Sequence, residues 1–160
     1  MEMQTLLNSL QATLMPAWEM IPDFGLYMDQ LISFVDKSAG VPEGGALTKS
    51  MVNNYVKSGL VDRPTGKTYT RDSIAQLMMI CRLKQVLTLD EMKELLHPYQ
   101  GHTTEQIYNG FRKEQLGWLE RIAPEREIDQ NPLTYAMQAS ACQTICRMLL
   151  EENRTPREEQ

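Results

Sequence analysis

The chain has 160 residues, of which 42% are hydrophobic, and its 16 basic and 21 acidic residues give a net charge of -5 at pH 7. This length and apolar content fit one compact domain, and three cysteines are too few for a disulfide scaffold. No apolar run approaches the roughly 18 residues of a membrane span, and no secretory signal opens the chain. We therefore expect a cytoplasmic protein without a membrane partner.

The N-terminal quarter predicts two helices separated by a proline. Leucine and methionine recur at helical spacing from Met3 to Leu14, and Pro16 ends that helix. A second helix is expected to begin near Asp23. The glycine- and proline-rich run 38–45 then indicates a loop or hinge.

The middle of the chain predicts a short helix, a β-hairpin and a longer helix. The short helix spans about 48–58 and stops at Gly59. A proline and a threonine-glycine-lysine turn signal predict a short hairpin over 60–69. Thr70 is placed to cap the next helix, which is expected to end near Val86.

Three more helix starts are predicted from local capping signals. Two are capping boxes, in which a threonine precedes a glutamate or glutamine by three residues. They are Thr88 with Glu91 and Thr103 with Gln106. These boxes open helices expected to end at Leu96 and near Ile122. Asn131 followed by Pro132 then predicts the start of the last helix.

The acidic total conceals a basic segment. Residues 47–88 carry seven basic and two acidic side chains, a net +5, whereas the rest of the chain carries -10. Exposed charges farther apart than a Debye length, about 8 Å in physiological salt, are largely screened from one another. A phosphate group docked on this segment would therefore interact mainly with its positive charge. The alternative is a solvated basic face without a partner.

The short helix has one apolar and one polar side. The polar side carries Lys49, Ser50, Asn53, Asn54 and Lys57. Asparagine weakens a helix interior, but its amide can pair with an adenine edge in the major groove, while lysine can contact guanine or phosphate. Arg63, Lys67 and Arg71 would then hold the DNA backbone. An ordinary solvated helix face is again the alternative.

Residues 47–61 resemble the recognition helix of mercury-resistance-regulator (MerR) type domains. The shared features are Tyr55 near the helix end, the Gly59-Leu60 exit, and Pro64 and Tyr69 in the hairpin. Residues 70–96 similarly resemble the two helices that follow the wing. The resemblance implies a mostly α-helical fold, namely a MerR-like winged helix-turn-helix with a short β-hairpin wing and additional N- and C-terminal helices.

A closer resemblance is to the bacterial domain-of-unknown-function family eighteen thirty-six. It rests on Ile21-Pro22-Asp23, on Leu26 to Gln30 and on Leu47 to Tyr69, and it extends over about 21–96. The implied organisation is an N-terminal amphipathic helix, the winged domain, a C-terminal helical pair and a polar tail. Their ranges are 1–20, 21–100, 101–153 and 154–160.

These features together predict a transcriptional regulator that binds double-stranded DNA. Because two DNA half-sites need two DNA-binding surfaces, we expect a homodimer formed by the helices after Gly101, with the N-terminal helix as a further candidate for the contact. A small-molecule effector is a further candidate partner. The alternative is a non-catalytic protein-protein interaction module with the same fold.

Other candidate sites carry weaker signals. Cys142 and Cys146 are spaced to share a soft metal or form a redox pair, but zinc needs about four ligands and buried cysteine packs as a small apolar residue. His97 and His102 are expected to be loop residues. An effector pocket could be lined by aromatic residues that are otherwise expected in the core. These are Tyr99, Tyr108, Phe111, Trp118 and Tyr135.

The sequence contains no phosphate-binding glycine loop, nucleophile elbow or His-Glu zinc motif. We therefore expect no enzymatic activity, no cofactor and no resident metal.

Overall fold

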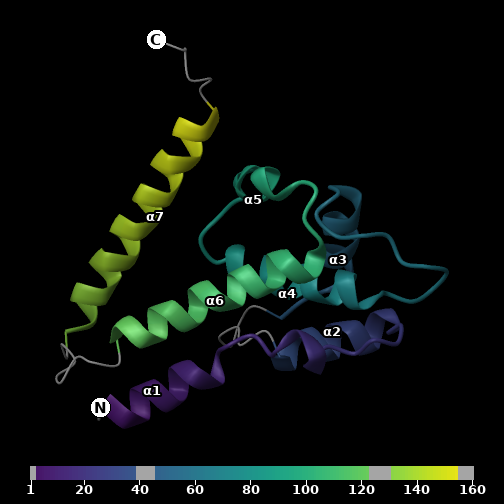
Figure 1. The fold of residues 1–160 in the computed structure, drawn as a ribbon, viewed down its shortest axis with the longest axis horizontal. Coiled ribbons are helices and arrows are strands. Elements are labelled where there is room, and N and C mark those ends of the chain that lie inside the picture. Colours follow the sequence, from purple (N-terminus) through teal and green to yellow (C-terminus); the bar gives the residue numbers. More distant parts are fainter. Residues whose placement is uncertain (1–2, 39–45, 123–130, 155–160) are drawn as a thin grey trace.

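The computed structural model describes residues 3–38, 46–122 and 131–154 (Figure 1). Within these ranges it contains seven α-helices and two short 3-10 helices, with no β-strand. In chain order they are α1 (Met3–Ala12), η1 (Trp18–Met20), α2 (Met28–Ser38), α3 (Lys49–Lys57), α4 (Arg71–Leu83), α5 (Leu89–Leu96), η2 (His97–Tyr99), α6 (Thr104–Ile122) and α7 (Pro132–Arg154). The expectation of a mostly helical chain is confirmed.

Helix α4 is the centre of the hydrophobic core. Eight of its thirteen residues are buried, and it packs against both α2 and α6. Its core side chains include Ile74, Leu77 and Met78, which are fully shielded from solvent. Burial of one such side chain contributes about 1.5–3 kcal/mol. The other helices are thus organised around α4.

The helix starts predicted from local capping are confirmed. The Thr88 hydroxyl accepts a hydrogen bond from the Glu91 amide at 3.3 Å, and a Glu91 carboxylate oxygen accepts one from the Thr88 amide at 2.7 Å. The same reciprocal pair joins Thr103 and Gln106. At the start of α7, the Asn131 side-chain oxygen accepts from a backbone amide of the first turn.

The predicted β-hairpin wing is wrong, and with it the winged class of fold. Residues 60–69 contain a tight turn closed by two backbone hydrogen bonds. The Thr65 amide donates to the Thr68 carbonyl at 2.9 Å, and the Thr68 amide donates to the Thr65 carbonyl at 3.2 Å. The next residue, Tyr69, pairs with Leu26 and not with the other arm of the turn. Its amide donates to the Leu26 carbonyl at 2.8 Å, and its carbonyl accepts from the Leu26 amide at 3.0 Å. Within the described residues no other backbone hydrogen bond joins the two arms of the turn, so the pairing stays at one bridge and no strand forms.

The same bridge explains why the second helix begins later than predicted. The sequence predicted a start near Asp23, whereas α2 begins at Met28. Leu26 is held in an extended bridge to Tyr69, so its backbone cannot join a helix. The Tyr27 amide donates to the Gln30 side chain at 3.0 Å, which caps the first turn.

Gly25 allows this bridge to form because its α-carbon lies against Thr68. A Cβ atom at position 25 would lie 2.6 Å from the Thr68 hydroxyl oxygen and 2.7 Å from its Cβ. We expect Gly25→Ala to lower the free energy of unfolding by about 1–3 kcal/mol in urea denaturation, since the backbone must shift. The matched control is Gly110→Ala in α6, where an added Cβ meets nothing within 4 Å. Equal stability of the two variants would contradict the close contact.

The last two helices differ in how they join the core. Helix α6 packs along α4, whereas α7 extends away from the bundle and contacts α5 (Figure 1). Only Leu150 is buried on α7, and Cys146 packs beside the core in a half-buried position. Most of the α7 surface is therefore exposed.

Candidate nucleic-acid interface

Helix α3 presents all five predicted polar residues to solvent. The Thr48 hydroxyl caps the helix by accepting a hydrogen bond from the Met51 amide at 3.2 Å. Val52 and Tyr55 are buried on the inner side. Because a helix repeats every 3.6 residues, this burial orients the other side outward. The exposed residues on it are Lys49, Ser50, Asn53, Asn54 and Lys57.

The asparagine amides on this face are unoccupied. Within the described residues, the side chains of Asn53, Asn54 and Lys57 have no hydrogen bond or ion pair. Lys49 lies 2.8 Å from a carboxylate oxygen of Asp29, but the two side chains are 62% and 80% exposed. Such a surface pair is worth only about 0–1 kcal/mol, so Lys49 can exchange Asp29 for another anion.

The turn after α3 adds two exposed cations. Gly59, with φ of +80°, ends α3 in a conformation that favours glycine and leads into this turn. Arg63 and Lys67 are both exposed there. The neighbouring Asp62 carboxylate accepts a hydrogen bond from the Gln76 side chain at 3.1 Å, which holds this acid toward α4. The turn therefore presents its two basic side chains to solvent.

Arg71 differs from the other predicted DNA contacts because the fold already holds its side chain. Its Nε donates to the Ile21 carbonyl at 3.0 Å, and its guanidinium lies 5.6 Å from the centre of the Trp18 ring. The side chain is only 27% exposed. Arg71 thus ties the start of α4 to the N-terminal segment, which sets it apart from the exposed cations of α3 and the turn.

The cysteines and histidines are placed as follows. Cys81 lies in the core, and burial raises the pKa of its thiol to about 11. Cys142 is an exposed free thiol and Cys146 is half-buried. His97 and His102 are exposed. In the described parts of the chain, no group of three or more His, Cys, Asp and Glu residues is arranged to hold a metal ion.

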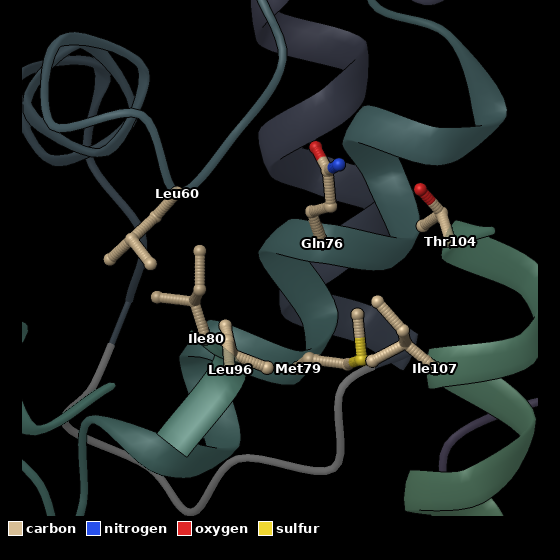
Figure 2. Close-up of a pocket in the computed structure, with 7 residues that line it drawn as sticks. All are labelled: Leu60, Gln76, Met79, Ile80, Leu96, Thr104 and Ile107. Atoms are coloured by element: carbon tan, nitrogen blue, oxygen red, sulfur yellow. The ribbon is translucent and has the colours of Figure 1, made fainter. Parts of the chain in front are cut away.

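The aromatic residues considered for an effector pocket do not gather around one. Tyr108 is fully buried, while Tyr99, Trp118 and Tyr135 are exposed. A cavity of about 90 Å³ between α4, α5 and α6 is shown in Figure 2. It is lined by Leu60, Gln76, Met79, Ile80, Leu96, Thr104 and Ile107. A cavity that holds benzene measures about 150 Å³, so this one is too small for such a ligand.

Sequence inspection missed the exposed apolar surface of α7. Its large exposed residues are Leu133, Tyr135, Met137, Ile145, Met148 and Leu149. The available signal was charge, because the 14 residues from Leu133 to Cys146 include no acidic or basic side chain. No helix in the described ranges has the length and apolar content to cross a membrane.

The structure thus defines a helical protein built around α4, with α3 exposed along one polar side. A family model described as "Domain of unknown function (DUF1836)" matches residues 16–111, and the chain belongs to this family. The closer of the two resemblances seen in the sequence is therefore confirmed, whereas the MerR likeness gains no support. No curated protein and no solved structure matches the chain.

Proposed function

We propose that this protein binds double-stranded DNA and regulates transcription, with α3 as the helix that enters the major groove. The supporting observation is the exposed side of α3, where Asn53, Asn54 and Lys57 lie together without side-chain partners among the described residues. An α-helix with its side chains is about 10–12 Å across, and the major groove is about 12 Å wide. The helix therefore fits the groove, with both amides available for base edges.

The charge distribution favours contact with the DNA backbone on either side of α3. Lys49 and Lys57 lie at the two ends of the helix, and Arg63 and Lys67 follow in the turn. Nearby acids compete weakly, since Asp29 is in a solvent-exposed pair and Asp62 is bonded to Gln76. In this proposal the four cations contact phosphates, and the asparagines contact bases.

A regulator of this kind would act in the cytoplasm as a homodimer, with one α3 for each DNA half-site. A small-molecule effector does not enter this proposal, because the aromatic residues expected to line its pocket do not gather around one cavity.

Selection of bound fragments from random duplex DNA, followed by measurement of affinity against salt concentration, tests the proposal. For the selected duplex, the double variant Arg63→Ala/Lys67→Ala is expected to flatten the slope of log affinity against log salt by about two units. The reason is that each lost phosphate contact removes about 0.9 units. Fluorescence anisotropy at several salt concentrations measures this slope.

The matched control is Lys113→Ala, which removes an exposed lysine from α6. It is expected to leave the slope unchanged. If the double variant keeps the wild-type slope, the turn does not contact phosphate. If no duplex is enriched and none binds even at low salt, the DNA-binding proposal fails.

The second candidate function, a non-catalytic protein-protein interaction module, is favoured by a different observation. Met20, Phe24 and Tyr27 are 71%, 66% and 57% exposed in the segment around the start of α2. Large apolar side chains this close in sequence are typical of protein contact surfaces. Absence of DNA binding, with the same three residues protected from solvent in a complex, would favour this function.

A further inference from the structure

Helix α7 exposes more apolar surface than its contacts within the chain explain. Six large apolar side chains on it are between 43% and 62% exposed. Single exposed leucines are ordinary, but an exposed cluster on one helix marks an interaction surface. The absence of charge from Leu133 to Cys146 strengthens this interpretation, because exposed helix faces normally carry charged residues.

The contacts of α7 with its own chain use the opposite side of the helix. Gln143 donates to the Val86 carbonyl at 2.7 Å, Arg147 pairs with Glu91 at 2.8 Å, and Arg154 pairs with Glu94. Leu150 is buried on the same side. At about 100° per residue, Leu150 is half a turn around the helix from Ala141. The side centred on Ala141 therefore faces away from α5.

That side carries a ridge with a symmetric pattern of side-chain sizes. The α7 ridge consists of Leu133, Met137, Ala141, Ile145 and Leu149, spaced four residues apart and all exposed. Its smallest residue is in the middle, and large apolar residues follow at equal distances in both directions. Ridges of this spacing interdigitate when two helices cross at about 50°, with the closest approach at the crossing point.

We propose that the α7 ridge is the contact surface for a second copy of this chain, with the two α7 helices crossed and antiparallel about Ala141. The small side chain at the centre lets the two backbones approach. Antiparallel packing places Met137 against Ile145 of the other copy, and Leu133 against Leu149, so that every large residue meets another. The acidic pair Glu151 and Glu152 then lies at opposite ends of the two helices, which separates like charges.

A dimer formed through the α7 ridge would bring two α3 helices into one assembly. Its role in DNA binding rests on the proposed function, whereas the dimer itself does not. The assembly itself is tested without DNA. Failure of dimerisation and failure of DNA binding are therefore separate results.

Sedimentation velocity over about 1–100 μM protein is the measurement. The wild-type chain, of 18.4 kDa, is expected to sediment with twice its chain mass at the upper end of this range. Ala141→Arg places two like charges at the crossing point and is expected to raise the dimer dissociation constant about 100-fold or more. Circular dichroism checks that the variant stays helical, as expected for an exposed position.

The matched control is Ala136→Arg, an exposed alanine of the same helix that lies away from the α7 ridge. It is expected to leave the dissociation constant unchanged. A wild-type chain that stays monomeric at 100 μM overturns the proposal, as does an equal effect of the two arginine variants.

The antiparallel direction has its own test. Met137→Lys and Ile145→Glu are each expected to weaken the dimer, because each buries an unpaired charge. The double variant Met137→Lys/Ile145→Glu brings opposite charges together across an antiparallel crossing and is expected to be more dimeric than either single variant. Parallel packing would bring like charges together, so a double variant weaker than both singles overturns the assigned direction.

Discussion

Replacement of Tyr108 by alanine is expected to lower the free energy of unfolding by about 3–5 kcal/mol. The Tyr108 ring is fully buried and packs 5.8 Å from the centre of the Trp18 ring. Its hydroxyl donates to the Pro16 carbonyl at 2.8 Å. Alanine would leave a cavity beside α4 and remove the only donor to that carbonyl that the described residues provide. Urea denaturation followed by circular dichroism measures the change.

Two further variants separate the causes of this loss. Tyr108→Phe removes only the hydroxyl and is expected to cost about 1–2 kcal/mol. Tyr99→Ala, at a residue 44% exposed, is the control and is expected to change the free energy of unfolding by less than about 0.5 kcal/mol. If Tyr108→Ala is no more destabilising than Tyr99→Ala, the N-terminal segment is not anchored through this ring.

Tyr108 also contributes to the alkaline limit of stability. Burial raises the pKa of its phenol from 10.0 to about 12, because the ionised form would lose its hydration. A raised pKa stabilises the fold fully below the unfolded value and less as the pH rises toward the folded value. Between pH 10 and 12, wild type is therefore expected to lose more stability than Tyr108→Phe.

Local chemistry explains why many helix starts could be predicted from the sequence. A capping box joins residues only three positions apart, so Thr88 and Glu91 carry the whole signal within one turn. The helical spacing of Ile74, Leu77 and Met78 similarly predicts which side of α4 is buried. These features need no knowledge of the distant chain.

The wing failed as a prediction because its outcome depends on a distant partner. A turn signal with a flanking tyrosine is consistent with a hairpin, but the Tyr69 backbone bonds Leu26, which lies far away in the sequence. The late start of α2 has the same cause. Neither the bridge nor the fit of Gly25 against Thr68 is visible in a local pattern.

The candidate site was predictable where it depends on helix periodicity and not where it depends on packing. Spacing alone placed Asn53 and Asn54 on the side of α3 opposite Val52 and Tyr55, as the structure has them. The engagement of Arg71 with Trp18 depends on how the N-terminal segment folds back, so charge counting could not show it. On α7, an apolar pattern typical of a core helix is instead exposed.

Replacement of Asn53 by alanine is expected to reduce the preference for the selected duplex over a mismatched one by about 5–150-fold. A bidentate amide contact with adenine supplies about 1–3 kcal/mol of discrimination. Binding to an unrelated duplex is expected to stay unchanged, since phosphate contacts from Lys57, Arg63 and Lys67 remain. Competition between the two duplexes at fixed salt measures the preference, and Asn54→Ala is analysed in the same way.

A loss of protein stability in Asn53→Ala cannot account for a reduced preference between the two duplexes. Within the described residues Asn53 has no side-chain partner, and alanine is the better helix former, so the free energy of unfolding is expected to stay equal or to rise slightly. Asn109→Ala, an exposed asparagine on α6, provides the matched control for composition and is expected to leave the preference intact. If Asn53→Ala weakens both duplexes by one common factor, the amide contacts the backbone, because a phosphate contact carries no base preference.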